Sequence, residues 1–214
     1  MAFSIVHSGT GTTSVSIAGV AAGNLIVMNI RWTNDASTSC SVSDGTSSFE
    51  MTSVISNSTQ RMQFAYLLIS NSGDLTFTVT FPGSTHTQRV ELYEVDYANT
   101  VVMDATNTGT GTGATATSGT ISTTGTVEII FGGGGNFDGA YSNEKIAGAA
   151  VDGAVAYNAF NYLSYKTFSS TQENITASHS VSRAGEWTCS IIAFKELSGL
   201  SIPVVQSIYR RRRI

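Results

Sequence analysis

The sequence has few charges, few prolines and few cysteines. Charged residues make up 12% of its 214 residues, and there are two prolines and two cysteines. Two cysteines, Cys40 and Cys189, are too few for a disulfide framework, and we expect both to be buried free thiols, with a single bridge between them as the alternative. No run approaches 18 apolar residues, so no membrane-spanning helix is predicted. The N-terminal stretch lacks the basic region and the continuous apolar segment of a secretory signal, so we expect a protein that is not exported.

Serine, threonine, glycine and asparagine are abundant and separate short apolar runs. This texture is typical of many-stranded antiparallel proteins, in which each short strand buries one face and turns follow closely. We therefore predict an all-β fold, an antiparallel β-sandwich with a jelly-roll-like arrangement. Residues 1–197 are expected to form one domain, followed by an extended C-terminal arm at residues 198–214.

Alternation of apolar and polar residues places most of the strands. A low-complexity run at 106–124 is predicted to be a loop or an edge strand, and a short helix is expected around Lys145–Val151. The predicted strands are Phe3–Ser8, Ser14–Val20, Leu25–Thr33, Ser37–Ser43, Phe49–Ser56, Gln60–Ser70, Leu75–Phe81, Gln88–Tyr97, Thr126–Phe131, Phe160–Phe168, Asn174–Val181 and a closing strand at 186–196.

The arm is the strongest candidate for a binding segment. Its ten predicted partner-binding residues are six apolar side chains and a run of arginines: Leu200, Ile202, Val204, Val205, Ile208, Tyr209, Arg210, Arg211, Arg212 and Arg213. We expect the apolar side chains to dock in a groove or add a strand to a neighbour, while the arginines pair with carboxylates. A solvated chain end is the alternative.

Charge is distributed unevenly along the chain. The four terminal arginines leave seven Lys and Arg against 15 Asp and Glu in residues 1–209, a net charge of −8. An acidic body argues against nucleic-acid binding by the body, although phosphates are a rival partner for the basic tip.

No catalytic constellation is recognisable, and we predict neither an enzyme nor a cofactor. His7, His86 and His179 lie in separate segments without zinc-site spacing, and we expect them to be isolated surface residues. There is no G-x-S-x-G nucleophile elbow. Gly132–Gly135 follows a strand, but no Lys-Ser or Lys-Thr pair completes a phosphate loop, so close backbone approach or a bulge is the preferred interpretation.

Two binding functions remain open, namely calcium binding and glycan binding. Asp44, Asp138 and Asp152 offer oxygen ligands for Ca²⁺ but sit in Asp-Gly turns, so turn formation is the simpler interpretation.

Aromatic residues gather in the second half of the sequence, where an exposed ring can stack on a sugar. Tyr157 is expected in a loop, whereas Phe160, Tyr162 and Tyr165 are expected in the core, and Tyr141 is the fifth member of this group. A glycan ligand for this region is possible.

The order of several segments resembles a diffuse family of β-sandwich modules from phage virion and bacterial surface proteins. These segments are GVAAGNLIVMNIRW, VSDGTSSF, MQFAYLLI, GDLTFTVTF, RVELYEVDY, TTGTVEIIFGGGG and EWTCSIIAFKE. The resemblance implies a jelly-roll-like sandwich used for display or attachment. We expect a virion structural protein, a capsid decoration or head-fibre protein of a tailed phage that forms homo-oligomers. The arm lies outside the resemblance, and from its own residues we expect it to anchor the protein to capsid, portal or tail proteins. The alternative is a carbohydrate-binding or adhesin module of a tail fibre or bacterial surface.

Overall fold

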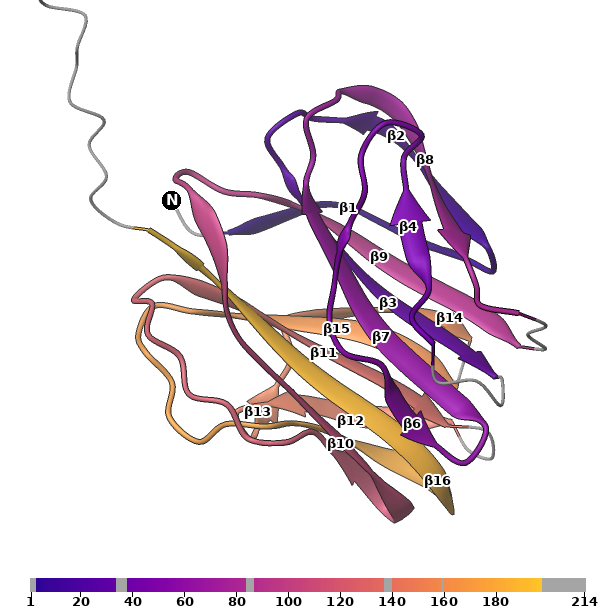
Figure 1. Ribbon diagram of the computed structural model, residues 1–214. Coiled ribbons are helices and arrows are strands. Elements are labelled where there is room, and N and C mark those ends of the chain that lie inside the picture. The colour runs from indigo at the N-terminus through magenta and orange to yellow at the C-terminus, as the bar shows by residue number, and fades with distance from the viewer. Residues whose placement is uncertain (1–2, 34–37, 84–86, 137–139, 159, 198–214) are drawn as a thin grey trace, which may run out of the picture.

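The computed structural model describes residues 3–33, 38–83, 87–136, 140–158 and 160–197 (Figure 1). All of its regular secondary structure in these ranges is β-strand, as the sequence predicts. The strands are β1 (Ser4–Gly11), β2 (Ser14–Val20), β3 (Leu25–Thr33), β4 (Ser41–Ser43), β5 (Glu50–Met51), β6 (Ile55–Asn57), β7 (Gln60–Leu68), β8 (Gly73–Thr80), β9 (Gln88–Asp96), β10 (Val101–Thr117), β11 (Glu128–Asn136), β12 (Tyr141–Ile146), β13 (Ala149–Ala150), β14 (Gly153–Asn158), β15 (Asn161–Phe168) and β16 (Ala177–Glu196).

The strands form three sheets in which every pair is antiparallel. The central sheet has the order β1-β9-β3-β7-β5, with β6 also paired to β7. The outer sheet has the order β2-β8-β4, and the C-terminal sheet has the order β13-β12-β16-β11-β15-β14, with β10 paired to β16. The first two sheets come from residues 4–96 and the third from residues 101–196, so each half of the chain builds its own part of the sandwich (Figure 1).

Three hydrophobic clusters hold these sheets together. The outer cluster joins the outer and central sheets through side chains that include Val15, Met28, Phe77 and Leu92. The middle cluster joins the central and C-terminal sheets through side chains that include Leu25, Val27, Phe64, Tyr93, Phe131 and Phe194. The third cluster lies within the C-terminal half and includes Ile130, Ile146, Trp187 and Ile191. The central sheet is therefore covered on both faces, which explains why all nine residues of β3 are buried and why its sequence is nearly continuously apolar.

The end of the chain differs from the prediction in one respect. Two strands were expected, at Asn174–Val181 and at 186–196, whereas the structure has one 20-residue strand, β16. Its pairing with β10 shifts between Gly113↔Gly185 and Thr115↔Ser180, so the polar stretch between the two apolar segments is a bend within one strand and not a loop.

The low-complexity run forms most of β10, an edge strand of the C-terminal sheet that pairs with β16 among the described residues. This agrees with one of the two predicted alternatives. The glycines of this run have a steric role, because a Cβ atom on Gly111 would lie 2.5 Å from the ring of Trp187.

The helix predicted around Lys145–Val151 is wrong. Ile146 pairs with Ala149 across a two-residue hairpin whose central residues, Ala147 and Gly148, have φ values of 55° and 73°. A turn with two positive φ values matches the twist of antiparallel strands. Asparagine or aspartate is the usual residue at the first of these positions. Because Ala147 stands there instead, the sequence did not indicate the turn.

Candidate functional site

The ten partner-binding residues predicted on the arm, from Leu200 to Arg213, lie outside the described residues. The last described residue is Leu197, whose amide donates a hydrogen bond of 2.8 Å to the carbonyl of Thr100. The candidate site is therefore the surface of the body next to Leu197.

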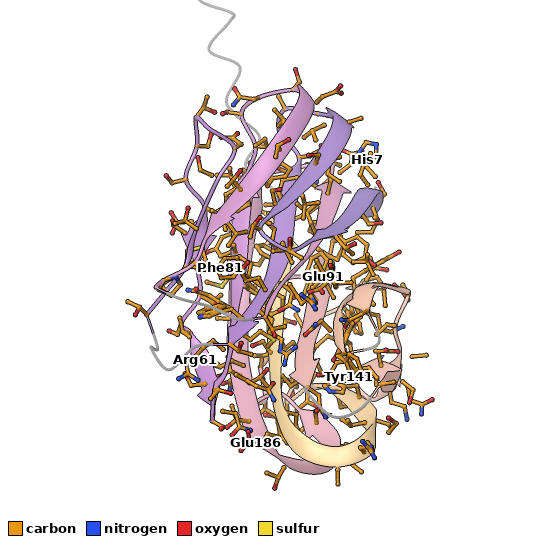
Figure 2. The ribbon with its side chains drawn as sticks, turned by 90° about the vertical axis from the view of Figure 1, so that its right-hand side faces the viewer. His7, Arg61, Phe81, Glu91, Tyr141 and Glu186 are labelled. Carbon is orange, nitrogen blue, oxygen red and sulfur yellow. The ribbon has the colours of Figure 1, made fainter. Side chains whose placement is uncertain are left out.

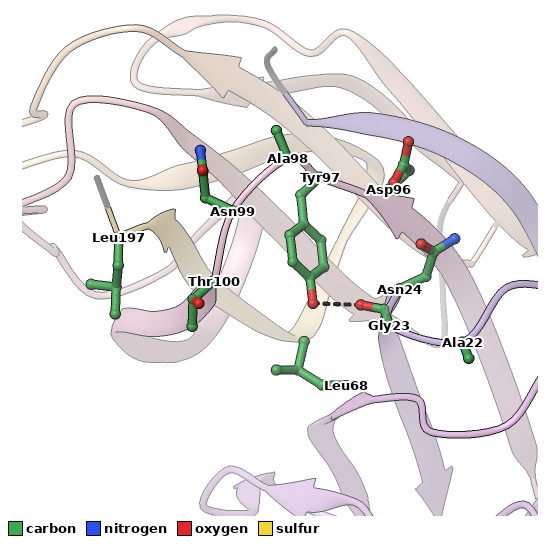
Figure 3. Close-up of a pocket in the computed structure, with 10 residues that line it drawn as sticks. All are labelled: Ala22, Gly23, Asn24, Leu68, Asp96, Tyr97, Ala98, Asn99, Thr100 and Leu197. Carbon is green, nitrogen blue, oxygen red and sulfur yellow. Dashed lines mark hydrogen bonds between the residues drawn. The ribbon is translucent and has the colours of Figure 1, made fainter. Parts of the chain in front are cut away.

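Leu197 lines an open cavity of about 720 Å³ at one end of the sandwich (Figure 3). The other lining residues come from the β2–β3 turn, the end of β7 and the β9–β10 connection: Ala22, Gly23, Asn24, Leu68, Asp96, Tyr97, Ala98, Asn99 and Thr100. The Tyr97 hydroxyl donates a hydrogen bond to the carbonyl of Gly23. Partial burial and the nearby Asp96 carboxylate raise the pKa of Tyr97, so the hydroxyl keeps the proton that it donates.

An apolar groove of about 190 Å³ adjoins this cavity and shares Leu68 with it. Its lining residues are Leu25, Glu50, Tyr66, Leu67, Leu68, Val101, Val102, Met103 and Phe194. Leu68 and Met103 are 44% and 40% exposed, and they are two of the five large apolar side chains that are exposed in the described part of the chain. Neighbouring exposed apolar side chains in a groove mark a binding surface more strongly than single ones do.

Glu196 fixes the β9–β10 connection that forms one wall of the cavity. Its carboxylate accepts hydrogen bonds of 3.0 Å from the amide of Ala98 and from the side chain of Asn99. Val101 pairs with the same glutamate in the β10–β16 ladder. The end of β16 and the start of β10 are thus joined at the point where the chain leaves the body.

A second group of residues, the interior polar cluster, lies between the central and C-terminal sheets and was not predicted. It consists of Asn29, Arg31, Glu91 and Asn161, all of them buried. The Asn29 amide donates to the Glu91 carboxylate at 3.0 Å and to the carbonyl of Tyr162 at 3.0 Å. Arg31 donates to the side-chain oxygen of Asn161 at 2.8 Å. Figure 2 shows where Glu91 lies among the strands.

The glycine run in β11 makes room on both faces of the C-terminal sheet, for this cluster on one face and for Tyr162 and His179 on the other. A Cβ atom on Gly135 would lie 2.6 Å from Cδ of Arg31, and one on Gly134 would lie 2.5 Å from the Tyr162 ring and 2.8 Å from His179. Real Cβ contacts are not this short, so the strand tolerates only glycine at these two positions. Close backbone approach, which the sequence favoured over a phosphate loop, is confirmed.

The titratable groups near His179 are held uncharged. The Tyr162 hydroxyl lies 2.6 Å from Nδ1 of His179, and the Sγ atom of Cys189 lies 4.0 Å from the same nitrogen. Burial lowers the pKa of His179 to about 3 and raises the pKa of Cys189 to about 12. A neutral imidazole and a protonated thiol do not make a nucleophile at neutral pH.

Glu91 is also held near its neutral form. Burial raises the pKa of Glu91 to about 8, against the opposing effects of the Asn29 hydrogen bond and of the charges on Arg31 and Arg89. The same burial lowers the pKa of Arg31 to about 10. Two signals in the sequence could have indicated this cluster: Asn29 and Arg31 interrupt the most apolar strand, and Glu91 lies inside another apolar run.

The histidines have different environments. His7 lies at the sheet edge, where its Nδ1 atom is 2.6 Å from the Glu94 carboxylate (Figure 2). His179 is buried, so its expected surface position is wrong. His86 lies outside the described residues.

The candidate calcium ligands are used in turns. Asp44 accepts hydrogen bonds from Thr46 and Ser47, and Asp152 accepts them from Thr167. Asp138 lies outside the described residues. Within the described ranges, no group of three or more His, Cys, Asp and Glu side chains is placed to hold a metal ion.

The predicted aromatic group divides into buried and exposed members. Tyr141 and Tyr162 pack edge-to-face with 5.0 Å between ring centroids, and Tyr165 packs against the middle cluster. Phe160 is 38% exposed, so its expected core position is wrong. Tyr157 is 36% exposed, lies in β14 and not in a loop, and has the Arg89 guanidinium 4.4 Å from its ring centroid.

Both cysteines are free and buried, as expected, with Cys40 in the outer cluster and Cys189 in the third cluster. Over the described ranges, no helix is long and apolar enough to cross a membrane. The chain matches no model of a known protein family, and searches of curated proteins and of solved structures found no similar protein.

Proposed function

We propose that the protein is a structural component of a virion, a capsid decoration or head-fibre protein of a tailed phage, and that its C-terminal arm attaches it to the particle. One observation carries this proposal: the chain leaves the body at Leu197, beside an open cavity that continues into an apolar groove. The sequence that follows supplies six apolar side chains, which suit an apolar groove, and four arginines, which suit attachment to an acidic surface.

The arrangement of the first half supports a display module. Strands β1 to β4 alternate between the central and outer sheets, and β1-β9-β3-β7 faces β2-β8-β4. Alternation of this kind is expected of a jelly roll, in which two Greek keys interlock, and jelly rolls are common in capsid proteins. We propose that residues 4–96 form such a unit and that the C-terminal sheet is an addition to it.

A non-catalytic role fits the chemistry of the interior polar cluster. Glu91 in this cluster, and His179 and Cys189 on the other face of the C-terminal sheet, are buried and close to their neutral forms. The proposal accordingly includes no cofactor. Its partners are capsid, portal or tail proteins and further copies of the chain.

Deleting 200–214 tests the proposal. The truncated body is expected to fold, because all three hydrophobic clusters lie within the described residues, but it should be lost from purified particles of the phage that carries the protein. Full occupancy by the truncated chain would show that the arm is not the anchor. Replacing all four terminal arginines with serine should make attachment weaker and less dependent on salt, since exposed ion pairs are screened by salt.

A carbohydrate-binding or adhesin role is the second candidate, because Tyr157 and Phe160 expose their rings close together in sequence. A glycan array with the full chain tests it. Binding that disappears in Tyr157→Ala and Phe160→Ala, but remains in the control Val6→Ala, would favour this role over attachment.

A further inference from the structure

We propose that the apolar part of the arm, residues 200–209, docks in the groove of its own body that is lined by Leu68, Met103, Tyr66, Val102 and Phe194. The arm is then held in cis, and only its basic tip is left to meet a partner. This inference does not depend on the proposed function, because it concerns the isolated protein.

The point where the described chain ends is the first argument. Leu197 itself lines the cavity, and the cavity shares Leu68 with the groove. From Leu197 to Leu200 is three residues, a reach of about 10 Å in extended chain. The first apolar side chain of the arm therefore reaches this surface without a long connection.

The chemistry of the groove is the second argument. All but one of its nine lining residues are apolar or aromatic, and the exception is Glu50. Leu68 and Met103 are 44% and 40% exposed. Burying apolar area contributes about 25 cal/mol per Å². The sequence that follows Leu197 supplies six apolar side chains for such burial.

The geometry of the edge strand is the third argument. β10 forms one wall of the groove and is paired on one side, with β16, in the described part of the molecule. Pro203 lacks an amide hydrogen and favours an extended backbone, which is compatible with a segment lying along a sheet edge.

The short connection also favours docking in cis over docking on a second copy. A tethered segment meets its own groove at an effective concentration in the millimolar range when the tether can span the distance. A groove on another molecule at micromolar concentration competes poorly with this.

Disulfide trapping in the full chain tests the proposal. Met103→Cys is combined in turn with Ile202→Cys, Val204→Cys and Val205→Cys, and each variant is exposed to a mild oxidant. The native thiols interfere little, because burial raises the pKa of both Cys40 and Cys189 to about 12. We expect at least one pair to form an intramolecular disulfide whose yield does not change with dilution.

The matched control replaces Met103→Cys by Val6→Cys. Val6 is 45% exposed but lies on β1, which β9 and β3 separate from β7 in the central sheet, and it should give no intramolecular disulfide. Disulfide-linked dimers would overturn the proposal in favour of a second copy as the occupant. Absence of any disulfide from all three pairs would overturn it as well. If Met103→Cys disturbs folding, Leu68→Cys replaces it.

Limited proteolysis gives an independent readout. Chymotrypsin should cleave the arm at Leu200 and Tyr209 on the order of tenfold faster in a Leu68→Ser, Met103→Ser double variant than in the wild type, since tenfold corresponds to about 1.4 kcal/mol. Val6→Ser serves as the control and should leave the rate unchanged. Equal rates in the double variant and the wild type would contradict docking in the groove.

Discussion

The two faces of the central sheet are built from the same strands but carry different kinds of side chain. Toward the outer sheet, β3 presents Ile26, Met28, Ile30 and Trp32, all in the outer cluster. Toward the C-terminal sheet, it presents Leu25 and Val27 and then changes to polar side chains. One face relies on apolar burial along its whole length. The other combines an apolar end with a polar end that must satisfy hydrogen bonds, so it fixes the position of its partner sheet more narrowly.

The largest loss of folding stability is expected from a substitution in the core on the apolar face. Phe77→Ala removes a fully buried ring that packs edge-to-face on Phe49 at 5.7 Å, and it should lower the free energy of unfolding by about 3–5 kcal/mol. Urea unfolding measures this. Thr78→Ala, on the exposed side of the same strand, should change it by less than about 0.5 kcal/mol. Similar losses in both variants would mean that this face is not a tightly packed core.

A methyl group added at the polar end tests how tightly that end is packed. Gly135→Ala places a Cβ atom 2.6 Å from Cδ of Arg31, and we expect a loss of about 1–3 kcal/mol in the free energy of unfolding from overpacking. Ser142→Ala on the exposed part of β12 is the control in the same sheet. An unchanged free energy of unfolding in Gly135→Ala would show that Arg31 can move aside.

The pH dependence of stability separates the two faces further. Because the folded-state pKa of Glu91 is raised from 4.5 to about 8, the unfolded chain releases this proton first, and stability falls as pH rises through that window. We expect up to about 1.4 kcal/mol per pH unit from this one group. Glu91→Gln should remove this loss in urea unfolding between pH 5 and pH 8, whereas Glu50→Gln should not. An unchanged slope in Glu91→Gln would mean that Glu91 is ionised in the folded protein.

For His179, folding stability is expected to change with pH in the opposite direction. Its folded-state pKa is lowered from 6.5 to about 3, so the unfolded chain takes up the proton first and stability falls as pH decreases below 6.5. His179→Asn keeps an acceptor near the Tyr162 hydroxyl and should flatten the curve between pH 6.5 and pH 5 by about 1 kcal/mol per unit. His7→Asn is the matched control. A curve that remains steep in His179→Asn would assign the acid sensitivity to another group.

The sequence predicted the class of fold and most strands because alternation is a local signal. Leu75, Phe77 and Val79 alternate with threonines, and they face inward in β8 as expected. What it missed depends on contacts between distant residues. Nothing local joins Asn29 to Tyr162, and the bend in β16 becomes a strand through its pairing with β10 and β12. The groove was missed for the same reason, since Leu68 and Phe194 come from opposite halves of the chain.

The division of the sheets between the two halves of the chain has a consequence for synthesis on the ribosome. Residues 4–96 can complete the central and outer sheets before residues 101–196 emerge, and that second half takes about 5–20 s to be made at 5–20 residues per second. During this interval one face of the central sheet, with Leu25, Val27, Phe64 and Tyr93, has no cover from its own chain. The nascent protein then presents a wide apolar surface to the cell, and chaperones that bind such surfaces should recognise it at this stage of translation.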